Sequence, residues 1–347
     1  MTHRPIGYYV HHHGAGHRAR AEAIAAAIDW PVVLIGTGLG TAGIDLCDDR
    51  PLSGSFDGVD ETASRPAALH YAPLDHEGVR SRVAQIAQWI ATARPALLVV
   101  DVSVEVAMLA RLASVTTIYV RLNGDRSDVA HLDAFRGATA LLAPFHRELE
   151  MPSTPLWIRN KSRYLPGITP ATPDHLPEDD RILVVIGRGG PPGDGPAIAQ
   201  AARACPNMQW RVIGPVTATA DPPTNLDLAG WVNDPTQEIA RAGLIIGAAG
   251  DGLVSAVLAA NRPFLCIPED RPFNEQLATA LGLCRLNAAV VLETWPSPDQ
   301  WPGLIRQAKM LPLQCRKRLH DRDGVDMAAR WLAGMAAAAV QELDPVA

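Results

Sequence analysis

The segment that decides the fold reads IIGAAGDGLVSAVLAANRPFLCIPEDRPFNEQLATAL, from Ile245 to Leu281. It begins as an apolar strand, turns at Gly250, Asp251 and Gly252, and continues into small apolar residues that favour a helix. A second apolar run, Phe264–Ile267, follows, so the segment predicts a strand–helix–strand unit with parallel strands. Glycines let the backbone approach a ligand, and the free N–H groups at a helix start favour a phosphate. A plain turn between strand and helix would show the same residues.

The same alternation of strands and helices extends through both halves of the chain. The first half contains predicted strands at Ile6–Val10, Val32–Ile35, Ala96–Val100 and Thr116–Val120. The second half contains predicted strands at Ile182–Ile186, Gln209–Ile213, Leu244–Ile246 and Phe264–Ile267. We therefore expect an α/β protein with two doubly wound, Rossmann-like halves. Ligands in such folds bind beyond the carboxyl ends of the strands, which places the active site in the cleft between the halves.

A proline-rich segment predicts the boundary between the halves. The sequence LPGITPATPDHLPEDD, residues 165–180, holds four prolines and no apolar period, which is typical of a linker. We expect an acceptor-side domain over residues 1–164 and a donor-side domain over residues 181–325. A final helix within residues 326–347 is expected to pack back on the first domain.

The composition excludes several classes of protein. Hydrophobic residues make up 48% of the 347 residues and charged residues 20%, which is typical of a globular protein. The formal net charge of −6 gives no reason to expect a nucleic-acid partner. No apolar run reaches the roughly 18 residues of a membrane-spanning helix, and the N-terminus lacks the apolar core of a signal peptide. The five cysteines are scattered, which indicates reduced thiols in a cytoplasmic protein.

The order of motifs in the first-quoted segment resembles the donor-binding region of MurG-like and other GT-B glycosyltransferases. A helix with Val254-Ser255, a turn Asn261-Arg262-Pro263 and the pair Glu275-Gln276 follow one another at the spacings of that family. The resemblance implies a GT-B fold and a nucleotide-sugar substrate, with no further cofactor. One position departs from the pattern. Ala256 stands where the family commonly carries a glutamate that accepts hydrogen bonds from the ribose hydroxyls.

Two further parts of the second half occupy the places of donor-binding loops in the same family. The loop 187–190 follows a strand, so Arg188 could pair with a diphosphate or only cap the loop. The pair Trp231-Val232 matches the turn that holds the nucleotide base, although a half-buried core tryptophan is the alternative. The resemblance assigns the following residues to the donor: Gly187, Arg188, Gly189, Gly190, Trp231, Val232, Gly250, Asp251, Gly252, Leu253, Val254, Ser255, Asp270, Asn274, Glu275 and Gln276.

The segment Gly14-Ala15-Gly16-His17 resembles the first loop of MurG-like enzymes and the entry motif of natural-product glycosyltransferases, although Arg20 stands where the latter carry proline. In the latter group the histidine is the general base that deprotonates the acceptor, so His17 is the predicted base. Asp101 follows the strand Leu97–Val100 and matches the aspartate that orients this histidine. The alternatives are a histidine that caps the turn or touches a phosphate, and an aspartate that caps the next helix.

Acceptor-side residues are expected in loops that follow first-half strands: His13, Gly14, Gly16, Arg121 and Asn123. The charged loop after Val120 could equally be a solvated loop. The histidines at 11–13 do not predict a metal site, because adjacent side chains on a strand point to opposite faces and no second ligand cluster follows. Residues 38–43 satisfy G-x-G-x-x-G, but no amphipathic helix opens there, so we expect no nicotinamide or flavin.

These features predict an inverting, metal-independent glycosyltransferase of the hexosyltransferase type with a UDP-linked donor. The acceptor is expected to be a small molecule or a lipid-linked glycan, and a lipid-linked acceptor would bring peripheral membrane contact. Two alternatives stay open at this stage. One is a nucleotide-sugar hydrolase of the same fold, in which His17 activates water. The other is a non-catalytic sugar-nucleotide-binding partner of a second enzyme, which the alanine at position 256 makes conceivable.

Overall fold

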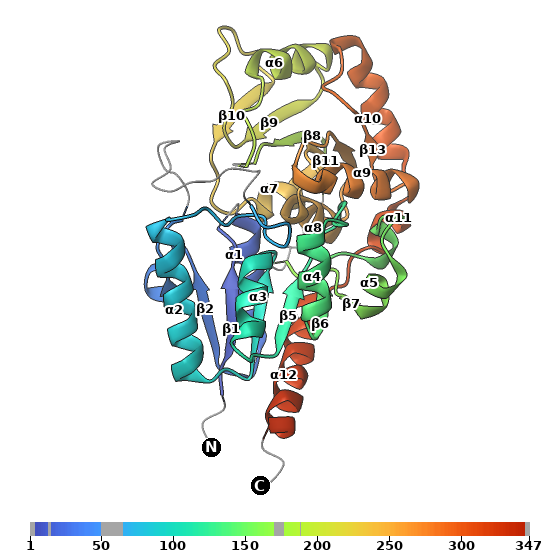
Figure 1. Cartoon of the computed structure of the whole chain (residues 1–347). Coiled ribbons are helices and arrows are strands. Elements are labelled where there is room, and N and C mark those ends of the chain that lie inside the picture. Colours follow the sequence, from blue (N-terminus) through green and yellow to red (C-terminus); the bar gives the residue numbers. More distant parts are fainter. Residues whose placement is uncertain (1–3, 13–14, 50–64, 170–176, 188, 344–347) are drawn as a thin grey trace.

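The computed structural model describes residues 4–12, 15–49, 65–169, 177–187 and 189–343, and it contains two β-sheets (Figure 1). The first sheet has the strand order β3-β2-β1-β4-β5-β6-β7, and the second has the order β10-β9-β8-β11-β12-β13. All the strand pairs within these two sheets are parallel. The prediction of an α/β protein with two doubly wound halves is therefore confirmed. Among the predicted site residues, His13, Gly14 and Arg188 lie outside the described residues.

The first sheet takes its strands from the first half of the chain. They are β1 (Ile6–Val10), β2 (Val32–Gly36), β3 (Ile44–Asp45), β4 (Leu97–Asp101), β5 (Thr117–Val120), β6 (Ala140–Ala143) and β7 (Ser162–Tyr164). One face packs on α1 (Ala15–Ala27), and the other on α2 (Glu77–Ala93), α3 (Val104–Leu112) and α4 (Val129–Gly137). Because helices cover both faces, β1 and β4 are buried along their whole length, and apart from the final Asp101 of β4 they carry no charged residue and do not alternate.

The second sheet is built in the same way. Its strands are β8 (Glu178–Val185), β9 (Gln209–Ile213), β10 (Leu226–Gly230), β11 (Ala242–Gly247), β12 (Phe264–Cys266) and β13 (Val290–Val291). Its helices are α6 (Gly195–Ala204), α7 (Thr236–Arg241), α8 (Asp251–Ala260), α9 (Glu275–Arg285), α10 (Trp301–Met310) and α11 (Leu313–Lys317). The short helix α5 (Leu156–Lys161) precedes β7 in the first sheet.

The last helix, α12 (Gly324–Leu343), belongs in space to the first sheet. Its residues Ala328, Leu332 and Ala336 are fully buried in the same core as Ile24 of α1 and Val99 of β4. Figure 1 shows α12 in red, running away from the second sheet beside the strands of the first. Among the helices that the structure describes, none has the length and apolar character needed to cross a membrane.

Both sheets have a point at which the strand order reverses. In the first sheet β1 lies between β2 and β4, and in the second β8 lies between β9 and β11. A crevice opens beyond the carboxyl ends of the strands at such a point. The topology therefore predicts that ligand-binding residues directly follow β1, β4, β8 and β11.

Several elements differ from the sequence-based boundaries. The strand β8 begins at Glu178, inside the segment predicted to be a linker, and Leu165 and Ile168 of that segment are buried in the core of the first sheet. The helix α8 begins at Asp251, so that Asp251 and Gly252, which were predicted to lie in the turn before it, belong to its first turn and Ser255 to its second. The N–H groups that open this helix therefore come earlier in the chain than predicted.

Candidate functional site

The two halves of the chain meet where the start of α1 faces the amino end of α8. The helices α1 and α8 are in contact, and a β-carbon added to Gly16 would lie 3.8 Å from the Cα of Gly252. Each glycine lies at the start of a helix that follows a strand at a switch point. Side chains from the first turns of these two helices therefore share one cleft.

The structure brings His17 and Asp101 together. The Nδ1 atom of His17 lies 3.0 Å from Oδ1 of Asp101, and the His17 side chain is 14% exposed while Asp101 is fully buried. Asp101 is the last residue of β4, and the cap of α3 is Ser103, whose hydroxyl accepts a hydrogen bond from the N–H of Val106. The alternative that Asp101 caps the helix is therefore wrong. Its carboxylate faces the imidazole instead.

A buried arginine, which the sequence analysis did not assign, completes this group. Arg20 is 3% exposed and donates to both carboxylate oxygens of Asp101, at 3.0 and 3.1 Å. Its other terminal nitrogen donates to Oδ2 of Asp251 at 2.5 Å. Burial alone would raise the pKa of Asp101, but Arg20 and His17 together outweigh it and lower this pKa to about 2. The available signal was the departure from proline at position 20.

The amino end of α8 is suited to bind an anion. Its cap residue, Gly250, has no side chain to accept hydrogen bonds from the first-turn N–H groups. Asp251, the first residue of the helix, is 26% exposed and pairs with Arg20. Ser255 lines the pocket between the sheets together with Asp251 and Glu275. The predicted phosphate-binding helix start therefore faces the cleft, with one carboxylate already present beside it.

Gln276 joins the two loops of the second sheet that border the cleft. It is 6% exposed, and its side-chain oxygen accepts hydrogen bonds from the backbone N–H groups of Ala249, at 3.1 Å, and Glu269, at 2.8 Å. The sequence assigned this amide to the sugar hydroxyls. In the structure its oxygen instead holds the loop before α8 against the loop before α9.

Glu275 is the first residue of α9, and an arginine of the first sheet reaches it. The Nη2 atom of Arg126 lies 2.8 Å from Oε2 of Glu275, and the Arg126 guanidinium also stacks over the ring of Phe273, 5.2 Å from its centre. Burial raises the pKa of Glu275, and the charge of Arg126 partly opposes this effect. The resemblance assigns Glu275 to the donor, but no motif in the sequence singles out Arg126.

The loop before α9 approaches the first sheet closely. The N–H of Asp125 donates to the carbonyl oxygen of Phe273 at 2.7 Å, and a β-carbon on Gly124 would lie 2.6 Å from the same oxygen. Gly124 also has a φ of 120°, so only glycine fits this position without strain. Phe273 and Asn274 both adopt left-handed backbone angles. Such conformations are costly for non-glycine residues and are often found at functional sites.

The remaining predicted donor residues are spread over several segments of the second half of the chain. The side chain of Arg271 donates to the carbonyl oxygen of Gly189, which ties the loop after β8 to the loop before α9. Trp231 is 43% exposed, so the alternative of a core tryptophan is wrong, whereas Val232 packs partly on the core. Asp270 and Asn274 are exposed, and Gly187 and Gly190 lie in the segment after β8. Leu253 and Val254 lie in the first turn of α8, where Val254 is buried in the core.

The two acceptor-side candidates after β5 are engaged within the protein. Arg121 is 3% exposed and forms an ion pair with Glu150, and it also donates to the hydroxyl of Ser162. Asn123 is equally buried and donates to the carbonyl oxygen of Leu149 at 2.9 Å. The alternative of a solvated loop is wrong for both residues. Asn123 also lines the pocket between the sheets.

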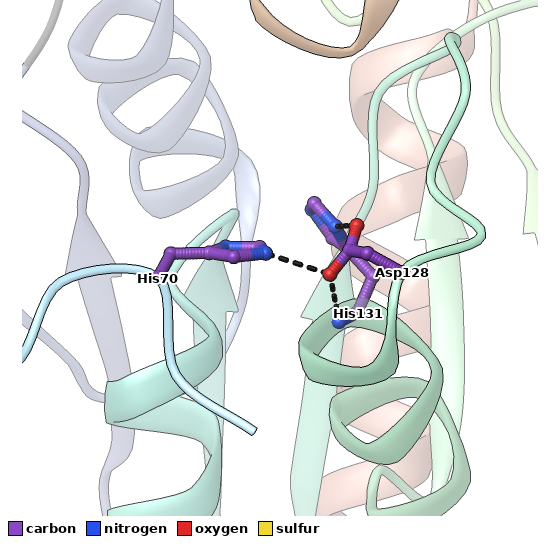
Figure 2. Close-up of side chains that lie close together, drawn as sticks. All are labelled: His70, Asp128 and His131. Atoms are coloured by element: carbon purple, nitrogen blue, oxygen red, sulfur yellow. Dashed lines mark hydrogen bonds and ion pairs between the residues drawn. The ribbon is translucent and has the colours of Figure 1, made fainter. Parts of the chain in front are cut away.

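A second histidine–aspartate cluster lies on the first sheet, at the carboxyl ends of β4 and β5, and the sequence analysis missed it. Figure 2 shows His70 and His131 gathered at the carboxylate of Asp128. Nε2 of His70 lies 2.8 Å from Oδ1 of Asp128, and Nδ1 of His131 lies 2.6 Å from Oδ2. Both imidazole rings also contact the ring of Phe273. The cluster therefore touches the loop that carries Glu275.

The ligand-type atoms of these three residues lie within 4.8 Å of one another, the only group of this kind in the described part of the chain. A metal-bound imidazole normally donates its second N–H to a carboxylate or carbonyl. In His131 the second nitrogen instead faces the Arg126 guanidinium at 3.1 Å. Burial and then Arg126 lower the pKa of His131 to about 4. We interpret the cluster as a hydrogen-bond network, in which a neutral His131 accepts from Arg126 and donates to Asp128.

No protein-family model and no curated protein sequence matches the chain, but solved structures do. It is similar to MurG of Acinetobacter baumannii, with a TM-score of 0.65 and 14% identity over 95% of this chain and 99% of that one. It is also similar to the spinosyn forosaminyltransferase SpnP, with a TM-score of 0.66 and 13% identity over 99% of both chains. The chain has the GT-B fold. This confirms the fold expected from the resemblance.

A third GT-B structure extends the comparison. The glycosyltransferase VinC in complex with dTDP is 13% identical, with a TM-score of 0.64 over 97% of this chain and 100% of that one. Each of the three likenesses covers 95% or more of this chain. In this GT-B chain the predicted base and the predicted phosphate-binding helix start lie on opposite sides of one cleft.

Proposed function

We propose that this protein is a glycosyltransferase that moves a sugar from a nucleoside diphosphate donor to an acceptor hydroxyl. One observation carries the proposal: the His17–Asp101 pair and the start of α8 border the same cleft from opposite sheets, with Arg20 between them. A general base on one side and an anion-binding helix start on the other supply the two functions that this transfer needs. The names of the similar structures, among them a forosaminyltransferase, support the same activity.

The chemistry follows from the positions of the protons. With the Nδ1 proton donated to Asp101, the Nε2 lone pair of His17 can take the proton of the acceptor hydroxyl. The acceptor oxygen then forms a bond to the anomeric carbon on the side opposite the leaving group, and the bond to the diphosphate oxygen breaks. The configuration at the anomeric carbon is inverted. The N–H groups that open α8 stabilise the charge that develops on the departing diphosphate.

The nucleotide is the least constrained part of the donor. The resemblance of the donor segment favours UDP, as the sequence analysis predicted. Ala256, in the second turn of α8, offers no carboxylate to a pair of ribose hydroxyls. Two of the similar structures, the spinosyn rhamnosyltransferase SpnG and VinC, were solved with thymidine diphosphate, whose deoxyribose lacks one of those hydroxyls. We therefore propose a pyrimidine nucleoside diphosphate sugar, with UDP and dTDP as the forms to compare.

The two sheets divide the reaction between them in this proposal. Residues 1–164 form the acceptor-side domain, in which His17 and Asp101 act, and residues 181–325 form the donor-side domain. The acceptor is a small hydroxylated molecule or a lipid-linked glycan. A transferase of this kind requires that the acceptor hydroxyl reach Nε2 of His17 while the diphosphate contacts the start of α8.

The decisive experiment uses the purified full-length protein and a His17→Ala variant. Thermal unfolding with UDP, dTDP and their sugar conjugates identifies the nucleotide, because a ligand that binds the folded state raises its apparent stability. Turnover with the identified donor should fall by about 10² to 10⁴ in the variant, the usual contribution of a general base, while the thermal shift is retained. Unchanged turnover would remove His17 from the mechanism. Release of free sugar at the full rate without an acceptor would instead indicate a hydrolase.

A further inference from the structure

Arg20 lies between His17, Asp101 and Asp251, three residues assigned to the proposed reaction. It stands three residues after His17 on α1, so that both side chains point from the same face of that helix. Its guanidinium contacts Asp101 of its own sheet and Asp251 of the other sheet. With 3% exposure it cannot turn to solvent without a movement of the surrounding chain. A displacement of the second sheet would therefore remove one of the two carboxylates that hold Arg20.

The same atom of His17 has two competing neighbours. Nδ1 lies 3.0 Å from Oδ1 of Asp101 and 3.1 Å from Nη2 of Arg20. A neutral imidazole carries one proton, on one of its two nitrogens. If Nδ1 carries it, Nδ1 donates to Asp101 and Nε2 is a base. If Nδ1 accepts from Arg20, Nε2 carries the proton and cannot accept another.

Asp101 is shared in the same way. Its Oδ1 atom lies 3.1 Å from Nη2 of Arg20 as well as 3.0 Å from Nδ1 of His17. Arg20 therefore competes with His17 for one carboxylate oxygen and also offers a donor to the imidazole. Asp251 draws the other end of the guanidinium across the cleft, with 2.5 Å between Nη1 and Oδ2. The ion pair between Arg20 and Asp251 therefore favours the hydrogen bond between His17 and Asp101.

We propose that Arg20 is a positioning residue through which Asp251 of the second sheet determines which nitrogen of His17 carries the proton. With the cleft closed, Arg20 is held between the two carboxylates and Nδ1 of His17 donates to Asp101. With Asp251 withdrawn, Arg20 takes Oδ1 of Asp101 and donates to Nδ1, so that Nε2 carries the proton. The imidazole is then a base only when the two sheets are together. The role of this proton in catalysis rests on the function proposed above.

The charges of the group agree with this role. Asp101 and Asp251 carry two negative charges against one positive charge on Arg20, and the three side chains are 0%, 26% and 3% exposed. A second positive charge on His17, gained when it takes the acceptor proton, makes the group neutral. Buried charges are tolerated when they are balanced. The closed cleft therefore stabilises the protonated imidazole that the reaction forms.

The test measures the proton directly and needs no substrate. Long-range ¹H–¹⁵N NMR of the full-length protein at about pH 8, where an ordinary imidazole is neutral, distinguishes the two tautomers, and His17→Ala assigns the signals. The wild type should carry the proton on Nδ1. In Asp251→Asn the Nε2–H form should become the major one. Asp133→Asn, at an exposed aspartate of α4, is the matched control and should leave the tautomer unchanged.

A second variant separates this role from a merely structural one. Because Asp251 acts through Arg20, the tautomer should return to Nδ1–H in the double variant Asp251→Asn with Arg20→Met. If Arg20→Met does not fold, Arg20→Lys tests the same link, since lysine lacks the second arm of the guanidinium. An unchanged tautomer in Asp251→Asn would overturn the proposal, and so would a shift that persists without Arg20.

The outcomes also separate this inference from the proposed function. Should Asp251→Asn move the proton while no donor is turned over, the coupling stands and the glycosyltransferase assignment fails. Where the wild type transfers sugar, kcat of Asp251→Asn should fall by about the factor by which the Nδ1–H population falls. Normal transfer together with an unmoved proton would reject the coupling and leave the proposed function in place.

Discussion

Arg126 of the first sheet forms an ion pair with Glu275 of the second, with 2.8 Å between Nη2 and Oε2. The ion pair between Arg20 and Asp251 also joins the two halves of the chain. In both pairs the arginine comes from the first half of the chain, and the carboxylate is the first residue of a helix, α8 or α9, that borders the cleft. Asp251 and Glu275, which are expected to bind the donor, therefore also form the contact between the two halves of the chain.

The first prediction concerns Arg126→Met. Loss of a hydrogen bond to a charged group costs about 1.5–3 kcal/mol, so the KM for the donor should rise about tenfold or more. Arg126 opposes the burial that raises the pKa of Glu275, so its loss should raise that pKa further and make the defect larger at low pH. Steady-state kinetics across a pH series measures both effects. Arg136→Met, at an exposed arginine of α4, is the control; an equal rise in KM there would contradict the prediction.

A second prediction concerns the stability conferred by Asp101. Its pKa is about 2 in the folded protein, below its ordinary value, so the ionised carboxylate stabilises the fold above the unfolded pKa. That contribution, on the order of 2 kcal/mol, should be lost as the pH falls from about 4 toward 2. Urea unfolding at a series of pH values should show the gap between wild type and Asp101→Asn narrowing over this range. Asp75→Asn, at an exposed ion pair, should show no such change.

His131 gives a pH dependence in a different range. Its pKa is about 4 in the folded protein, chiefly because of burial, so the unfolded chain takes up a proton at a higher pH than the folded one. The free energy of unfolding should therefore decrease as the pH falls from about 6.5 to about 4. His131→Gln should flatten the curve over this interval. A slope in the variant equal to that of the wild type would assign the effect to other groups.

The fourth prediction concerns nucleotide choice. Ala256→Glu places a carboxylate at the position where MurG-like glycosyltransferases, which the donor segment resembles, commonly accept hydrogen bonds from ribose. The variant should bind UDP more tightly relative to dTDP, by up to about tenfold for one hydrogen bond to a charged group. Isothermal titration with both nucleotides measures the ratio of the two Kd values. Ala259→Glu, also in α8, provides the matched control, because a general effect of negative charge would weaken both nucleotides alike.

Much of the fold could be predicted because its central strands are buried on both faces. The strands β1, β4 and β11 are continuous apolar runs bounded by turns, and these leave a clear signal in the sequence. The strands β3, β6, β7, β10 and β13 were missed. They are short, or carry polar residues because they lie at or near a sheet edge, as in Ser162–Tyr164. A short edge strand has little to distinguish it from a loop.

The site was predictable only where a local motif existed. His17 and Asp101 were found because each ends or follows a strand and matches a known pattern. Arg20 and Arg126 were not assigned, since their partners lie far away in the sequence: Asp251 is 231 residues from Arg20, and Glu275 is 149 residues from Arg126. An ion pair between distant segments leaves no periodicity or spacing to detect. Gln276 was found for its motif, but the structure shows its oxygen engaged with backbone N–H groups.

The position of α12 has a consequence for how the protein is made. Its buried residues Ala328, Leu332 and Ala336 complete the core beneath Ile24 and Val99, which a ribosome would release some two hundred residues or more earlier. The first half of the chain therefore cannot finish its own core until α12 has been synthesised. Until α12 has emerged, part of its apolar surface stays uncovered, whereas domains that close locally can fold as they appear.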